Sequence, residues 1–227
     1  MERYIFTGVV AITLLALGVA FFLPSSAPQG PLYLPWQIEK TASGSTRVFG
    51  LELGSSTLGE ARQRFQESFE VSMFANDDGK KVVEVYFDTI ALSGLRARVV
   101  LVMALTAEQL NGFYERGVRI ATMGSGNRKV TLADSDLQAL LALPIASLTY
   151  IPRSNLDADV VLARFGHPAE RIRETDSKEG IEHWLYPLQG LDIAVHEKGR
   201  EVLQYVQPAR FELLRKPLLE KGALISG

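Results

Sequence analysis

The 227-residue sequence contains no cysteine. This absence excludes disulfide bonds, thiolate metal sites, cysteine nucleophiles and the acylated cysteine of a bacterial lipoprotein. The sequence also has no excess of either charge, because 24 Lys and Arg stand against 26 Asp and Glu, a formal net charge of -2. A chain without a basic block has no electrostatic footprint for a phosphate backbone, so we exclude nucleic acid as a partner.

Short catalytic motifs are missing as well. There is no Ser-x-x-Lys nucleophile pattern, no His-Glu-x-x-His zinc helix and no dinucleotide-binding glycine pattern. We therefore expect no catalytic residue and no cofactor-binding residue. Two alternatives stay open: an envelope hydrolase whose site is assembled from residues distant in sequence, and a sensor of a metal ion or small ligand.

The most apolar segment runs from Ile5 to Leu23, 19 residues without a charge. As a helix at about 1.5 Å per residue, it just crosses a hydrocarbon core of roughly 30 Å. A cleaved signal peptide is the alternative, but Pro28 follows the small residues at the cleavage position and hinders cleavage. Arg3 precedes the segment and the first Lys after it is Lys40. The sequence thus predicts a single-pass protein of the inner (cytoplasmic) membrane, with its soluble part facing the periplasm.

The rest of the chain predicts an α+β fold: an N-terminal transmembrane helix followed by tandem helix-on-antiparallel-sheet units. Helix starts are indicated where an N-cap hydroxyl is followed three residues later by an acid or amide, at Thr57, Thr106 and Ser154. Alternating apolar runs between the helices indicate strands. The expected parts are an anchor (1–23), a Pro-rich linker (24–45), a first α+β unit (46–145), a second α+β unit (146–208) and a C-terminal tail (209–227).

A hairpin is predicted around Gln189-Gly190, a plausible two-residue turn between runs 181–188 and 191–197. This turn pairs residues whose numbers sum to 379 and puts three apolar pairs on one buried face: Trp184 with Val195, Tyr186 with Ile193, and Leu188 with Leu191. The next run, 201–207, adds Val202 and Val206 to the same face.

The two predicted units look like diverged copies, because Ser56-Thr-Leu leads to Arg64-Phe65 and Ser154-Asn-Leu leads to Arg164-Phe165. The second copy, from Ile151-Pro-Arg-Ser-Asn-Leu to Phe165-Gly-His-Pro168 and on through Trp184-Leu-Tyr186, resembles the outer-membrane assembly lipoproteins of the SmpA/OmlA type. It is also similar to the β-lactamase-inhibitor-protein fold. This resemblance implies a helix-on-sheet unit, often in tandem, that binds proteins. The chain departs from the lipoproteins in lacking the acylated cysteine and in carrying an intervening segment, 106–143.

The predicted hairpin register suggests one metal site. His183 lies opposite His196 on the face away from Trp184, and Glu201 falls nearby on the following strand. A His/His/Glu cluster can bind zinc or respond to pH. The alternative is that these histidines are ordinary polar surface.

The same face provides the predicted partner-binding surface, which comprises His183 together with Leu185, Ala194, Leu203 and Tyr205. The amphipathic tail, broken at Pro217, either packs on its own domain or docks on a partner or membrane. These features together predict a non-catalytic protein-binding or scaffolding module, tethered to the membrane and bound to another envelope protein.

Overall fold

The computed structural model describes residues 32–124, 126–175, 180–197 and 199–225, and the chain from Tyr33 onward forms one compact unit. Its helices are α2 (Leu58–Phe65), α3 (Ala107–Glu115), α4 (Asp134–Leu140), α5 (Ala158–Phe165) and α6 (Glu212–Lys221). A small three-stranded sheet comprises β1 (Glu39–Lys40), β2 (Thr46–Val48) and β3 (Leu51–Glu52). The remaining strands are β4 (Glu70–Ala75), β5 (Lys81–Leu92), β6 (Leu95–Met103), β7 (Arg119–Thr122), β8 (Arg128–Thr131), β9 (Ile145–Pro152), β10 (Glu170–Glu174), β11 (Ile181–Tyr186), β12 (Leu191–His196), β13 (Val202–Val206) and β14 (Gly222–Leu224).

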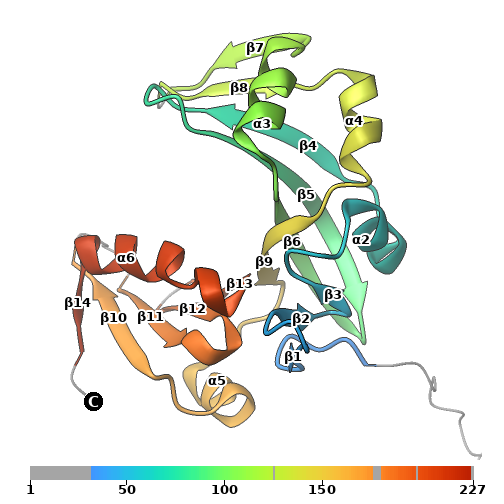
Figure 1. The fold of residues 1–227 in the computed structure, drawn as a ribbon. Helices are drawn as coiled ribbons and strands as arrows, with labels where there is room; N and C mark the ends of the chain where they lie inside the picture. Colours follow the sequence, from blue (N-terminus) through green and yellow to red (C-terminus); the bar gives the residue numbers. More distant parts are fainter. Residues whose placement is uncertain (1–31, 125, 176–179, 198, 226–227) are drawn as a thin grey trace, which may run out of the picture. The chain divides into compact units, whose positions relative to one another are not determined.

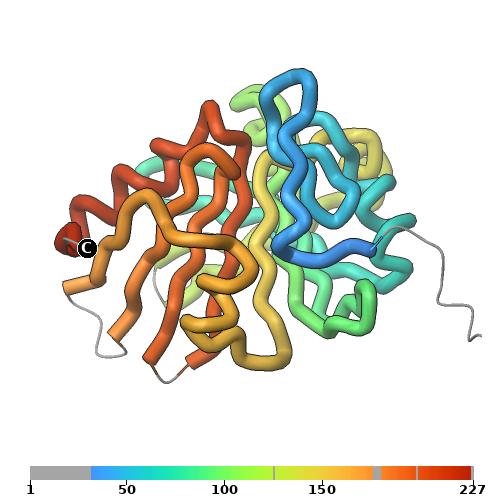
Figure 2. Tube along the Cα trace, turned by 90° about the horizontal axis from the view of Figure 1, so that it is seen from below, coloured from blue at the N-terminus to red at the C-terminus, as the bar shows by residue number. Residues whose placement is uncertain are grey.

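These eleven strands form a single sheet in the order β14-β10-β11-β12-β13-β9-β6-β5-β4-β8-β7, and neighbouring strands are antiparallel throughout. Strand β9 joins the two halves, because it pairs with β6 along seven positions and with β13 along four. Figure 2 shows the strands of the C-terminal half lying beside β9 without a break. The backbone groups of β6 and β13 that face β9 are therefore hydrogen-bonded, as buried strands require.

One face of this sheet carries the main hydrophobic core. Strand residues such as Val83, Leu101, Leu148 and Tyr205 are fully buried on it. Helices α2, α3, α4 and α5 each bury at least one apolar side chain in the same core, so we call this side the core face. Capping boxes start two of these helices, Thr57 with Glu60 and Thr106 with Gln109, and confirm the starts predicted from sequence.

The other side of the sheet, the second face, is covered only in part. Helix α6 packs there on β10, β11 and β13 through a small core of Ile172, Leu185, Val206 and Phe211, against which Leu214, Leu218 and Leu219 lie (Figure 1). Arg215 also pairs with Glu170 on β10 at 3.0 Å. The C-terminal tail thus packs on its own domain, which confirms one of the two expectations for it.

The predicted fold class is wrong. The described chain is mostly antiparallel sheet, and the strands of the two expected helix-on-sheet units belong to the same continuous sheet rather than to tandem units. The physical reason is the pairing of β6 with β9. In two separate sheets these strands would be edges with unpaired backbone N–H and C=O groups, and their pairing satisfies those groups. Among the described residues, no helix is long and apolar enough to cross a membrane. The predicted span, residues 5–23, lies outside them.

The hairpin register is also corrected. Residues of β11 and β12 pair with numbers that sum to 377, so Trp184 lies opposite Ile193 and Tyr186 opposite Leu191. The connection is a 3-10 turn, Pro187–Gln189, closed by Gly190 at φ 66°, because Pro187 has no N–H with which to extend the ladder. Leu188 is 80% exposed rather than buried. A slip of two residues keeps each side chain on its face, so the buried face of Trp184 is as predicted.

Two further sequence expectations fail locally. Val202 lies opposite Ala194, so Val202 and Val206 are on the second face and Leu203 and Tyr205 on the core face. The third capping box is absent: Asp157 is the N-cap of α5 and makes no side-chain capping bond. The carboxylate of Glu201 instead accepts a hydrogen bond from the backbone N–H of Leu156 at 2.7 Å.

Candidate functional site: the open face of the sheet

The part of the second face on β4, β5, β6 and β9, which we call the open face, carries half-buried apolar side chains that belong to neither core. They are Phe74, Val82, Tyr86, Val100, Val102 and Ile151. Intermediate exposure is what a central strand of a sheet gives to a side chain that has neighbours beside it and nothing above it. Polar side chains lie among them on the same face, because Glu84 is opposite Val102, Thr149 is opposite Val100 and Arg98 is opposite Ile151. A surface that mixes apolar and polar side chains in this way is typical of a protein interface.

The strand register places these side chains side by side. Tyr86 lies opposite Val100, and Val102 lies opposite Glu84, so β5 and β6 form the middle of the open face. Phe74 lies opposite Val82 and extends the apolar area toward β4. Directly paired side chains on one face are about 4.5–5.5 Å apart at Cβ, which is close enough for contact.

A shallow cavity of about 440 Å³ lies where the open face meets the β7–β8 turn. Phe74, Val82 and Met123 provide its apolar lining, and the side chain of Met123 is 43% exposed. Glu84 also lines it, and burial raises the pKa of this carboxyl. A cavity of this kind suits an apolar anchor side chain of a partner protein.

Polar side chains cluster at the other end of the open face, around Asp88. The hydroxyl of Tyr86 donates to Asp88 at 2.9 Å, and Arg98 and Arg153 approach the same carboxylate at 3.5 and 3.3 Å. The hydrogen bond from Tyr86 is the main reason that the pKa of Asp88 is lowered, and the same bond raises the pKa of Tyr86. Tyr and Arg are the residue types enriched in the energetic centres of protein interfaces.

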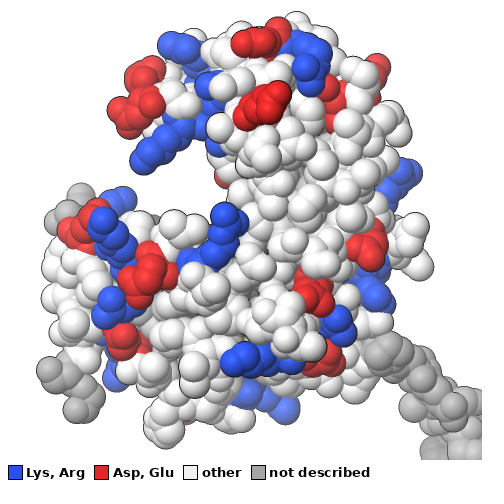
Figure 3. All heavy atoms as spheres, viewed as in Figure 1, with Lys and Arg blue, Asp and Glu red and all other residues white. Residues whose placement is uncertain are grey.

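The open face lies in a hollow between two raised flanks. Figure 3 shows this hollow between the side that carries α6 and the side that carries the β7–β8 hairpin. Strand β7 is an edge of the sheet, all four of its residues are exposed, and Ile120 within it is 49% exposed. Both flanks therefore offer further contact area next to the open face.

Comparison with protein-family models, with curated proteins and with solved structures gave no match to this chain. The open face holds apolar contact area, an anchor cavity and a polar cluster, which together can bind a protein surface.

The structure does not bring the predicted metal ligands together. His183 lies opposite Ala194 rather than His196, and His196 lies opposite Ile181. Glu201 directly precedes Val202, which is on the second face, so Glu201 points to the core side of the sheet and is separated from His183 by it. Among the described residues, no three His, Asp or Glu side chains are placed to hold a metal ion.

His183 instead lies buried on the second face between two carboxylates. Its Nδ1 is 2.9 Å from Oδ2 of Asp192, and its Nε2 is 3.2 Å from Oε1 of Glu174. Burial lowers the pKa of His183, but the hydrogen bonds and charges of Asp192 and Glu174 outweigh burial, and the pKa is raised. This arrangement stabilises a charged imidazole and has the features of a structural ion pair.

The predicted partner-binding surface is wrong for these residues. Leu185, Leu203 and Tyr205 are completely buried and Ala194 is 8% exposed, as is His183. Helix α6 covers Leu185, whereas Leu203 and Tyr205 belong to the core face. The sequence held a signal for the true open surface: Val99-Val100-Leu101-Val102 is apolar at both parities, which means that both faces of β6 carry apolar side chains.

Proposed function

We propose that this chain is a non-catalytic protein-binding module of the bacterial envelope that binds a partner protein with the open face of its sheet. The observation that carries the proposal is the set of half-buried apolar side chains on β4, β5, β6 and β9 that belong to neither core. The resemblance of Ile151–Val206 to protein-binding helix-on-sheet units supports the same function. Location at the inner membrane, facing the periplasm, is part of the proposal and is supported by the apolar segment 5–23 and by the positions of Arg3 and Lys40 on either side of it.

The size of the open face indicates how the partner binds. Four strands at about 4.8 Å spacing and about six residues at about 3.4 Å each span roughly 400 Å² in projection. A stable protein complex buries about 800 Å² on each partner. The partner therefore has to contact at least one flank as well, either α6 or the β7–β8 hairpin, and it places an apolar side chain in the cavity beside Met123.

Site-specific photocrosslinking in cells tests this proposal on the full-length chain. A benzoylphenylalanine residue is placed singly at Tyr86 and at Val100 on the open face. Matched controls carry it at Leu188, which is 80% exposed, and at Val160, which is 40% exposed on α5. We expect one and the same partner protein to be crosslinked from both open-face positions and from neither control.

A second variant distinguishes binding from chance proximity. Val100→Glu places a charge at the centre of the open face, where a bound partner would bury it without a counterion. We expect it to lower crosslinking from Tyr86 at least about ten-fold, a loss of about 1.4 kcal/mol in binding. Equal crosslinking from open-face and control positions would contradict the proposal. A crosslinked adduct that contains two copies of this chain would show that the open face binds a second copy of the same protein, not a different partner.

A further inference from the structure

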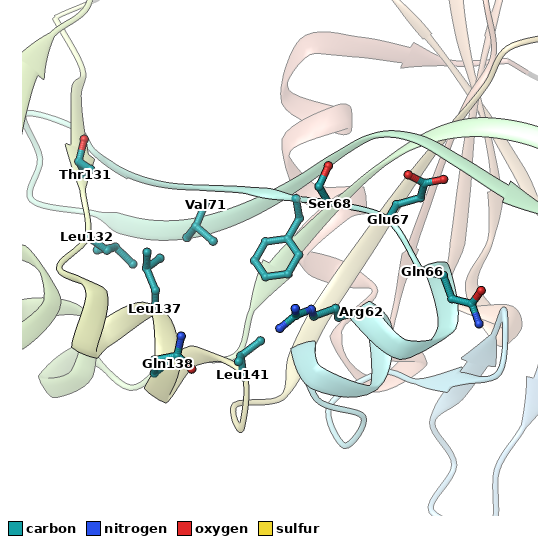
Figure 4. A pocket seen from close by; sticks show the side chains of 11 residues that line it. Arg62, Gln66, Glu67, Ser68, Val71, Thr131, Leu132, Leu137, Gln138 and Leu141 are labelled. Atoms are coloured by element: carbon teal, nitrogen blue, oxygen red, sulfur yellow. The ribbon is translucent and has the colours of Figure 1, made fainter.

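A second concave site lies on the core face, away from the open face. It is a groove of about 730 Å³ between α2, α4 and the start of β4, within the range of small-molecule sites in proteins. Its apolar wall consists of Phe69, Val71, Leu132, Leu137 and Leu141, and the polar residues Gln66, Ser68, Thr131 and Gln138 also line it. Figure 4 shows Leu137 on α4, and Leu141 directly after α4, across the groove from Arg62 on α2.

The walls of the groove are held by the main core. Leu132 is 2% exposed, and the four other apolar residues are half-buried and pack against the core. Their inner sides are fixed by packing while their outer sides face the groove, so an apolar ligand would bury contact area without first ordering the site.

Arg62 gives this apolar groove one positive charge. Figure 4 shows its guanidinium directed from α2 into the groove toward Leu141. Among the described residues it has no ion-pair partner. The one carboxylate in the lining, Glu67, lies at the margin with its oxygens directed away from the groove. A guanidinium beside an apolar wall is matched by a ligand with a single carboxylate at the end of an apolar chain.

We propose that this groove binds a medium-chain fatty acid, with the acyl chain along the leucine and phenylalanine walls and the carboxylate on Arg62. A single guanidinium pairs bidentately with one carboxylate and neutralises its charge, whereas a doubly charged phosphate would have only one cation to neutralise it. A peptide is disfavoured because its main chain needs hydrogen-bond partners along its length. Strand β4 pairs with β5 along Glu70–Ala75 and with β8 along Met73–Ala75, so it offers a peptide at most the short stretch Glu70–Ser72. An acyl chain has no such requirement.

Photoaffinity labelling of the full-length chain tests the assignment. The probe is a decanoic acid that carries a diazirine on its chain, compared with the alcohol of the same chain, and labelled residues are mapped by mass spectrometry. We expect the acid to label the stretches around Phe69–Val71 and Leu137–Leu141 at about ten-fold lower concentration than the alcohol, because the alcohol cannot form the charged bidentate pair.

Three variants, each checked for an unchanged melting temperature, make the test specific. Arg62→Gln should remove the preference for the acid, whereas Arg96→Gln, the same charge change at the exposed start of β6, should leave it intact. Gln138→Trp, which fills the groove from its rim on α4, should lower labelling by both probes. Equal labelling of the groove by acid and alcohol, or a preference for the acid that survives Arg62→Gln, would overturn the proposal. Neither result bears on partner binding at the open face.

Discussion

Substitutions of two adjacent valines on β5 test directly which face of the sheet is excluded from water. Val83 is completely buried on the core face opposite Met73, whereas Val82 is half-buried on the open face opposite Phe74. Threonine has nearly the shape of valine but replaces one methyl group with a hydroxyl. The two substitutions Val83→Thr and Val82→Thr are therefore matched in size, strand and local backbone, and they differ only in what the new hydroxyl meets.

The expected magnitudes differ by more than the error of the measurement. A hydroxyl buried without a hydrogen-bond partner costs about 1–3 kcal/mol in proteins, so Val83→Thr should lower the free energy of unfolding by that amount. For Val82→Thr, water can solvate the hydroxyl, and the expected change is within about 0.5 kcal/mol. In a chain of this length, 1 kcal/mol corresponds to roughly 2–4 °C in melting temperature.

Urea unfolding followed by the fluorescence of Trp184, which is 5% exposed, measures both variants. Val100→Thr on β6 repeats the open-face measurement at the centre of that surface. If Val82→Thr and Val100→Thr each cost as much as Val83→Thr, the open face is covered in the isolated protein, and the argument for partner binding there is refuted.

Two further predictions concern other parts of the fold. Because the folded pKa of His183 is raised, its contribution to stability is complete below about pH 6.5, the usual unfolded value, and is lost as the pH rises through the folded pKa. The urea midpoint of the wild type should therefore fall between pH 6 and pH 9. His183→Gln should flatten this fall, whereas His167→Gln, at an exposed histidine, should leave it unchanged. If the midpoint of His183→Gln still falls with pH, the ion pair of His183 is not the cause of the pH dependence. At Gly190, φ is 66° and a Cβ would lie 2.0 Å from the backbone oxygen of Val206, whereas Gly94 has φ 82° and nothing within 4 Å of its Cβ position. Gly190→Ala should lower the melting temperature more than Gly94→Ala. Both substitutions put an alanine at a positive φ, but only the alanine at position 190 also clashes with the backbone of Val206. An equal decrease in melting temperature would show that the structure relieves the clash at Gly190 without a loss of stability.

Local signals in the sequence were read correctly where the determining contacts are close along the chain. The capping boxes at Thr57 and Thr106 need only residues three positions apart, and both form. The alternation from Trp184 through Ile193 assigned one face of the hairpin to the core, and that face is buried. The amphipathic tail was expected either to pack on its own domain or to dock on a partner or membrane, and its helix α6 packs on the domain.

Errors arose where a choice depends on distant residues. The predicted 379 register counted Gln189-Gly190 as the whole turn, whereas Gly190 closes a longer turn and lies against the backbone of Val206, a contact that no local pattern contains. The parity of β13 was misassigned because the turn before it carries no register signal. The expected metal site depended on these two assignments. The expected binding surface failed at Leu203 and Tyr205 because of the parity of β13, and at Leu185 because α6 covers it.

The sequence by itself determined the helix starts at Thr57 and Thr106 and the alternation of buried side chains around Trp184, because these follow from capping and backbone periodicity. Only the tertiary structure decided that β6 and β9 pair to join eleven strands in one sheet, and that α6 covers the second face over β10–β13 but not over β4–β9. A period of two sorts side chains into two faces, but it does not say what covers each face. That depends on contacts between segments far apart in the chain, and it is these contacts that bury His183 and leave Val100 open.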